Sequence, residues 1–196
     1  MSRTAEASRR TGETDVRVRV DLDGTGAAEV ATGVGFFDHM LRLLARHALV
    51  DLEVAARGDL ETGSHHTVED VGITLGQALD EALGDRAGIE RYGSALVPMD
   101  ECLALAALDL SGRPFLACEV PLPPGVTVGG FETDLLAEFL RALANHARLT
   151  LHLRLVAGEN PHHVIEASFK AVARALAAAV APNPRAPDVP STKGSL

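Results

Sequence analysis

The chain repeats part of its own sequence about half a chain length apart. Residues 41–48 read LRLLARHA and residues 140–147 read LRALANHA, so six of the eight positions are identical at an offset of 99 residues. The similarity resumes downstream, where HHTVE at 65–69 aligns with HHVIE at 162–166. Such a repeat within 196 residues predicts two copies of one structural unit that share a core.

Each unit shows the same order of expected elements. Residues 15–22 alternate apolar and polar side chains like a half-buried strand, and we expect residues 26–31 to pair with them as a hairpin across Asp23-Gly24. The order strand-strand-helix-strand-helix predicts an α+β fold, an internally duplicated pair of two-layer half-domains. The remaining elements, from apolar spacing, are strands at 50–56, 101–109, 114–120 and 149–155 and helices at 36–48, 65–83, 132–146 and 162–180.

These patterns also set the expected boundaries. Residues 1–9 are predicted to be a flexible N-terminus, followed by a first half-domain at 10–93 and a second at 94–180. Within the second half, residues 121–130 contain three prolines and three glycines and are expected to form a loop. Residues 181–196 contain four prolines, which favour an extended C-terminal tail.

Charge and cysteine content narrow the functional classes. The formal net charge of −9 argues against nucleic-acid binding, which needs a basic surface. No apolar run approaches the roughly 20 residues of a membrane-spanning helix, and the first nine residues lack the apolar core of a secretory signal. Cys102 and Cys118 lie in apolar stretches and are expected to be reduced core thiols. These features predict a cytoplasmic protein with no membrane or nucleic-acid partner.

The strongest chemical signal is a His-His-x-x-Glu motif that opens an expected helix in each unit. Residues four apart lie on one helix face, so the first histidine and the glutamate of each motif can bind one metal ion. The second histidine lies about 100° around the helix axis, which favours a second ion. Ser64 and Asn160 precede the motifs as candidate helix N-caps. The six motif residues are His65, His66 and Glu69 in the first unit and His162, His163 and Glu166 in the second.

Two further histidines complete a candidate ligand set. His39 lies on the expected helix 36–48, and His152 lies on the expected strand 149–155. Six histidines and two glutamates divide into two sites of three histidines and one carboxylate. Such sites with open positions suit Mn(II), Fe(II) or Zn(II). Two positions left for substrate or water favour six-coordinate Mn over tetrahedral zinc.

Several motifs in register resemble the imidazoleglycerol-phosphate dehydratase family. Members of this family have a duplicated pair of α+β half-domains like domain 2 of ribosomal protein S5. They assemble into 24-subunit shells with active sites shared between subunits, and the resemblance implies the same here. The matching segments span about residues 9 to 196 and include GVGFFDHML from 33, HHTVED from 65, PMDE from 98, LSGRP from 110, TLH from 150, HHVIE from 162 and STKG from 191.

The resemblance also implies an activity and a cofactor. The activity is the Mn-dependent elimination of water from D-erythro-imidazoleglycerol phosphate to give imidazole-acetol phosphate, a step of histidine biosynthesis. Two Mn ions per active site are implied, and how the ligands divide between them stays open. The implied ligands are His39, His65, His66, Glu69, His152, His162, His163 and Glu166.

Substrate contacts follow from the same resemblance. Arg91 and Arg113 resemble the family's phosphate-binding arginines, and Ser191 and Lys193 make the tail a further part of the active site. Guanidinium groups bind phosphate oxygens in pairs, so this set suits a dianion. Glu13 resembles the acidic residue near the N-terminus that serves the family as acid/base.

The chain departs from the family pattern at two positions. Many members carry Gln where this chain has Leu43, which removes a side-chain contact to the substrate. Many carry an acidic residue where this chain has Ser64, which changes a neighbour of the motif histidines.

Other functions fit parts of the same pattern. A dinuclear metallohydrolase uses the same ligand types to activate a bridging water on a small phosphorylated substrate. A small two-layer α/β binding module is a second alternative, against which the acidic balance argues. A shell protein whose histidine clusters only join subunits through metal is a third. Metal occupancy without turnover would point to the shell protein.

Overall fold

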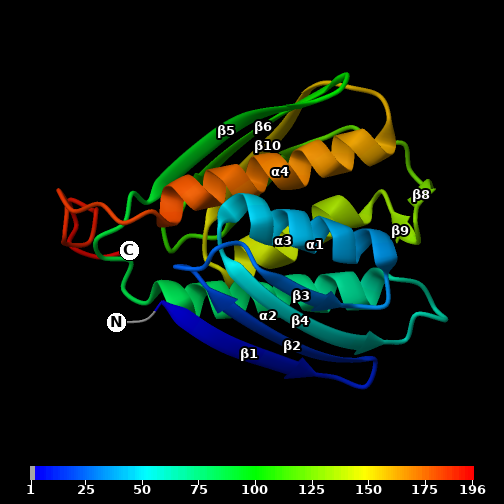
Figure 1. Ribbon diagram of the computed structural model, residues 1–196, viewed down its shortest axis with the longest axis horizontal. Helices are drawn as coiled ribbons and strands as arrows, with labels where there is room; N and C mark the ends of the chain where they lie inside the picture. Colours follow the sequence, from blue (N-terminus) through cyan, green and yellow to red (C-terminus); the bar gives the residue numbers. More distant parts are fainter. Residues whose placement is uncertain (1–2) are drawn as a thin grey trace.

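Two β-sheets form the outer layers of the molecule, with four helices packed between them (Figure 1). The computed structural model describes residues 3–196. The two similar sheets with their helices confirm the predicted α+β fold with internal duplication. The elements follow in the order β1 (Thr4–Arg10), β2 (Thr14–Asp21), β3 (Ala28–Ala31), α1 (Gly35–Ala48), β4 (Asp51–Gly58), α2 (His65–Leu83), β5 (Tyr92–Met99), β6 (Cys102–Asp109), β7 (Phe115–Glu119), β8 (Thr127–Val128), β9 (Phe131–Glu132), α3 (Leu135–His146), β10 (Thr150–Ala157) and α4 (Pro161–Val180).

The two halves have the same sheet topology. The first sheet has the order β1-β2-β4-β3 and the second the order β5-β6-β10-β7. In each sheet the first three strands are antiparallel, and the last pairs in parallel with its neighbour. Each four-stranded sheet therefore has one strand more than predicted, and its half follows the order strand-strand-strand-helix-strand-helix, with the short β8–β9 pair added before α3 in the second half.

The helices pack at the centre on small side chains and a few aromatic rings. A Cβ added to Gly76 of α2 would lie only 2.9 Å from the carbonyl oxygen of Leu143 in α3, so glycine allows these helices to approach closely. The rings of Phe37, Phe139 and Phe169 connect α1, α3 and α4, with centroid separations of 5.2 and 5.3 Å. Within residues 3–196, none of the helices is both long and apolar enough to cross a membrane.

The structure corrects the expected N-terminus. Residues 1–9 are predicted to be flexible, but residues 4–9 form most of β1 and pair with β2. Residues 1–2 lie outside the described part of the chain. The prediction is wrong because the inward positions hold two small apolar side chains, Ala5 and Ala7, and the charged Arg9, whose Nε donates to Asp70 of α2, so the apolar alternation is weak.

The expected boundary between residues 93 and 94 lies inside β5. This strand is at the edge of its sheet, where Gly93 and Pro98 are tolerated although they weaken the strand pattern in the sequence. The second half therefore begins at β5.

The segment 121–130 was expected to be a loop. It contains β8, which pairs with β9.

The predicted hairpin across Asp23-Gly24 is also wrong. Residues 26–31 contain β3, but β3 pairs in parallel with β4, and β4 occupies the edge of β2 where the hairpin partner was expected. The carboxylate of Asp51 holds the connecting segment, because its Oδ1 accepts hydrogen bonds from Thr25 N and Ala27 N, both at 2.8 Å. A long-range contact thus replaces a local turn.

The outer faces of the two sheets differ in chemistry. The first sheet carries ion pairs such as Arg19–Glu53, with a separation of 2.8 Å. The second sheet carries the Arg154–Glu119 ion pair, but it also exposes the apolar side chains of Leu96, Leu105 and Phe115, of which Leu96 and Phe115 are more than half exposed, at 57% and 54%.

Candidate active site

The start of α4 brings together one set of histidine and carboxylate side chains. The predicted cap at Asn160 is confirmed: its Oδ1 accepts a hydrogen bond from His162 N at 3.0 Å, and a proline follows it in the first turn. His162 Nε2 then lies 3.2 Å from Glu166 Oε2, one turn along the helix. His39 reaches the same oxygen from α1, with its Nε2 at 3.5 Å.

Glu166 is buried and has a separate partner for its other oxygen. Lys170, one turn further along α4, donates to Glu166 Oε1 at 2.7 Å. Burial acts to raise the pKa of Glu166, but the hydrogen bond and charge of Lys170, together with His39 and His162, outweigh burial, so the pKa of Glu166 is lowered. Glu166 is therefore an ionised acceptor whose Oε2 faces the two histidine nitrogens.

The start of α2 repeats part of this arrangement. His65 Nε2 lies 3.7 Å from Glu69 Oε2, and both side chains are about half exposed. Ser64 occupies the N-cap position, but its side chain makes no capping hydrogen bond. The prediction of a Ser64 cap is wrong because its hydroxyl donates to the carbonyl oxygen of Gly130, at 3.3 Å.

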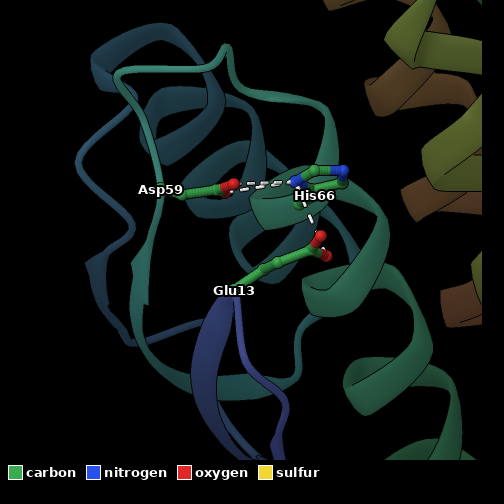
Figure 2. A group of neighbouring side chains, drawn as sticks. All are labelled: Glu13, Asp59 and His66. Carbon is green, nitrogen blue, oxygen red and sulfur yellow. Dashed lines mark hydrogen bonds and ion pairs between the residues drawn. The ribbon is translucent and has the colours of Figure 1, made fainter.

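His66 lies near two carboxylates from different connecting segments, Asp59 just after β4 and Glu13 in the turn between β1 and β2. Figure 2 shows Asp59 and Glu13 approaching one ring nitrogen of His66, while the other nitrogen is turned away from both. Asp59 Oδ2 accepts a hydrogen bond from His66 Nδ1 at 3.0 Å, and Glu13 Oε2 lies at 3.7 Å. The hydrogen bond to Asp59 is the main cause that raises the pKa of His66. Among residues 3–196, these three alone bring potential ligand atoms of three His, Cys, Asp or Glu residues within 4.8 Å of one another.

His163, the equivalent of His66 in the second half, also has a carboxylate partner. Its Nδ1 donates to Glu101 Oε2 at 2.8 Å, and its Nε2 lies 3.8 Å from Asp100. The hydrogen bond from His163 is the first cause that lowers the pKa of Glu101 to about 2. The same bond raises the pKa of His163.

His152 lies apart from the other predicted ligands. It is on β10, opposite Ala107 and Ala117 of the neighbouring strands, and its exposed ring is 5.8 Å from the ring of Phe115. This is the outer face of the second sheet, whereas α4 covers the inner face (Figure 1). The sheet therefore separates His152 from the histidines of its own α4.

The four predicted phosphate ligands line one pocket at the opposite end of the molecule. This pocket has a volume of about 640 Å³ and an open mouth. Tail residues 190–193 form one wall, and the segments just before β5 and just after β6 form the other. The predicted residues in its lining are Arg91, Arg113, Ser191 and Lys193.

Arg91 is held in place within this pocket. Its guanidinium donates to both carboxylate oxygens of Asp109, at 2.7 and 3.1 Å, and to the carbonyl oxygen of Pro190, at 2.8 Å. Two of its five N–H groups therefore remain for a ligand. Arg113 is two-thirds exposed, with Asp109 at 3.8 Å. The pocket thus combines the buried, firmly bonded guanidinium of Arg91 and the exposed guanidinium of Arg113 with the tail.

The pocket and the histidine motifs of one chain are far apart. Arg91 N bonds to Ala179 O near the end of α4, whereas His162 lies at its start. Seventeen helical residues separate these positions, which corresponds to about 25 Å. The substrate implied by the resemblance has only three carbons between its imidazole ring and its phosphate, so it cannot span that distance.

Sequence reasoning missed three residues that contact the predicted ligands. Lys170 could have been found from its spacing of four residues after Glu166 on the same helix face. Glu101 lies in the PMDE segment, where its acidic side chain could be read from the sequence. Its contact with His163, 62 residues away, could not. Asp59 had no local signal, since its contact with His66 depends on where β4 ends relative to α2.

Comparison with known proteins gives a consistent result over the chain. The family model described as imidazoleglycerol-phosphate dehydratase matches residues 32–176. Imidazoleglycerol-phosphate dehydratase from Moorella thermoacetica is 58% identical over 196 residues and covers 100% of both chains. The protein of the same name from Dinoroseobacter shibae is 59% identical over 195 residues, which is 99% of this chain and 100% of that protein.

Solved structures with the same name have a similar fold. The crystal structure of imidazoleglycerol-phosphate dehydratase from Staphylococcus aureus has a TM-score of 0.83 and 40% identity, covering 92% of this chain and 99% of that one. The enzyme from Pyrococcus furiosus has a TM-score of 0.83 and 38% identity, covering 96% of this chain and 99% of that one.

Proposed function

This chain belongs to the imidazoleglycerol-phosphate dehydratase family, and on that premise we propose that it converts D-erythro-imidazoleglycerol phosphate to imidazole-acetol phosphate with two Mn(II) ions per active site. Enzymes of this family are hydro-lyases, so the chain is a lyase of histidine biosynthesis. The observation that carries the proposal is the 58% identity with a dehydratase over the full length of both chains.

The donor chemistry of the chain fits the proposed ions. Glu166 Oε2 and the Nε2 atoms of His39 and His162 face one another, and His65 faces Glu69 in the same way. Imidazole and carboxylate ligands with open positions suit Mn(II). When bound, the ions supply Lewis acidity that favours an anionic imidazole ring, the electron sink this elimination needs. The proposed ligands are His39, His65, His66, Glu69, His152, His162, His163 and Glu166.

Glu13 is the proposed proton acceptor. The reaction breaks a C–H bond on the carbon beyond the ring-attached one and releases hydroxide from the ring-attached carbon. The resulting enol then tautomerises to the ketone. Glu13 suits this role because its carboxylate is more than half exposed and lies 3.7 Å from His66 Nδ1, which donates its hydrogen bond to Asp59 instead. A carboxylate outside that hydrogen bond remains able to accept a proton from substrate.

The pocket beside the tail is the proposed phosphate site. Arg113 and Lys193 supply exposed positive charge, Arg91 supplies donors in a fixed orientation, and Ser191 supplies a hydroxyl. Binding the phosphate positions the reactive carbons, and such positioning alone lowers the barrier by several kcal/mol in related cases, up to about 7–11 kcal/mol.

Sharing of the active site between subunits is part of the proposal. The distance of about 25 Å along α4 between the pocket and His162 supports a site built from different chains. The exposed position of His152 on an apolar sheet face supports a subunit contact there. A closed shell of 24 subunits would provide both the active site shared between chains and the subunit contact at His152. A cytoplasmic location is supported by the two free cysteines.

The test is turnover of imidazoleglycerol phosphate by chelator-stripped protein, with and without added Mn(II). We expect activity to disappear on stripping and to return with Mn(II). Protein that binds Mn(II) fully but does not turn over this substrate contradicts the proposal. Hydrolysis of a small phosphate ester by the same Mn-loaded protein would then favour a dinuclear metallohydrolase.

A further inference from the structure

The second histidine of each His-His-x-x-Glu motif presents the same ring nitrogen to a carboxylate outside the motif. His66 Nδ1 lies 3.0 Å from Asp59 Oδ2, and His163 Nδ1 lies 2.8 Å from Glu101 Oε2. An ionised carboxylate can only accept hydrogen bonds, so Nδ1 carries the hydrogen in both rings. The lone pair of each neutral ring is therefore on Nε2.

We propose that Asp59 and Glu101 are positioning residues, which fix the tautomer and orientation of His66 and His163 so that Nε2 of each ring is presented to a metal ion. The inference rests on the proposed function for the metal. It adds two side chains to the eight ligands expected from the sequence. Histidine ligands in metal sites commonly donate their second ring N–H to a carboxylate, which is the contact found here.

The two halves reach this contact from different loops. Asp59 directly follows β4, whereas Glu101 lies in the turn between β5 and β6. The corresponding turn of the first half, between β1 and β2, contains Glu13, which stays 3.7 Å from His66 Nδ1. Duplication alone would place the same loop against both histidines. The two halves thus share the carboxylate at Nδ1 and not the loop that supplies it. Glu13 is not needed for this contact and remains free to act as the proposed proton acceptor.

Each carboxylate is itself held in position. Glu101 Oε1 accepts from Asn160 N at 3.1 Å and from Cys102 Sγ at 3.3 Å, which leaves Oε2 for His163. These bonds tie the β5–β6 turn to the cap residue of α4. Asp59 Oδ2 accepts from Thr62 Oγ1 at 2.9 Å within its own loop. A fixed acceptor can orient an imidazole ring, whereas a mobile surface carboxylate cannot.

The test measures Mn(II) affinity rather than activity alone. Free Mn(II) is followed by electron paramagnetic resonance during titration of chelator-stripped wild-type protein and the variants Asp59→Asn and Glu101→Gln. Loss of an orienting carboxylate weakens metal binding by about 10–100-fold in known sites, and we expect that range for each variant. Glu53→Gln is the matched control: it removes one exposed carboxylate paired with Arg19 and should bind Mn(II) like the wild type.

Two further readouts separate positioning from a general loss of structure. Saturating Mn(II) should restore most of the turnover, because the ligands and Glu13 are unchanged. The melting temperature in the presence of chelator should match the wild type, and if one variant does not fold, the other carries the test. Wild-type Mn(II) affinity in both variants overturns the inference while leaving the proposed function intact. A wild-type protein that binds no Mn(II) overturns both.

Discussion

Glu13 lies in the turn between β1 and β2, close to a motif histidine but outside its hydrogen bond. If Glu13 accepts the substrate proton, Glu13→Gln keeps the shape of the side chain and removes the base. We expect turnover to fall by about 10²–10⁴-fold, the usual contribution of a general base. Steady-state kinetics with saturating Mn(II) measure this loss.

The control for Glu13→Gln is Glu6→Gln. Glu6 is an exposed carboxylate on β1 that pairs with Arg17 at 2.8 Å, so its substitution changes the net charge equally. Glu6→Gln should turn over like the wild type, and Mn(II) content should be the same in both variants. Near wild-type turnover of Glu13→Gln with metal bound would remove Glu13 from the mechanism.

Cys102 gives a prediction about thiol reactivity. Burial, followed by the hydrogen bond to Glu101, raises the pKa of the Cys102 thiol from 9.0 to about 11. Only the thiolate reacts, so at pH 8 this shift reduces the reactive fraction about 100-fold, and reactivity should rise with pH toward 11. Alkylation by iodoacetamide followed by peptide mass spectrometry should show Cys102 reacting at least that much more slowly than in urea-unfolded protein. Equal alkylation rates in folded and unfolded protein would contradict the raised pKa of Cys102.

At the scale of elements, the contact between α2 and α3 depends on glycine. In an open helix, Gly→Ala stabilises by roughly 0.5–1 kcal/mol. A Cβ on Gly76 would meet the backbone at the end of α3, with Leu143 O and the N atom of its C-cap residue Ala147 both at 2.9 Å. We therefore expect the opposite sign for Gly76→Ala, a loss of about 1–3 kcal/mol in the free energy of unfolding, measured in urea.

Gly35→Ala in α1 is the matched control, because nothing lies within 4 Å of a Cβ at that position. It should leave the free energy of unfolding unchanged or slightly higher. If Gly76→Ala is as stable as Gly35→Ala, the close approach of the two helices is not a constraint on the fold.

The helices could be predicted from the sequence more reliably than the strands, and the reason is physical. Helical spacing is local, so the expected helix at 65–83 agrees with α2, and that at 162–180 differs from α4 by one residue. Strand pairing is set by distant segments. β3 therefore joined β4 instead of β2, and β5 was hidden by Gly93 and Pro98 at a sheet edge.

At the scale of the whole molecule, the sequence predicted a set of site residues but not how they are distributed in the structure. The duplicated motif pointed to the histidines, and the resemblance pointed to the arginines and the tail. Neither could show that the two groups lie at opposite ends of α4, because that depends on how the tail returns to Arg91. The contacts of Asp59 and Glu101 were hidden for the same reason.

This distribution predicts complementation between inactive variants. Arg113→Ala disables the pocket and His162→Ala disables a metal ligand, so each protein alone should be inactive. If a working site takes its pocket from one chain and His162 from another, random assembly of equal amounts leaves both parts intact in about one quarter of the sites. Co-expression of the two variants with different affinity tags, followed by tandem purification, should therefore recover about a quarter of the wild-type turnover.

The control for this experiment combines two defects in the same pocket. Arg113 and Lys193 line one pocket of one chain, so in mixed assemblies of Arg113→Ala and Lys193→Ala every pocket carries one defect. That mixture should gain no activity beyond its parents. If Arg113→Ala with His162→Ala also gains none, although size-exclusion chromatography shows normal mixed assemblies, then pocket and histidines act within one chain. The tail and α4 would in that case have to move by some 25 Å relative to each other, a rearrangement that the hydrogen bonds from Arg91 to Pro190 and Ala179 oppose.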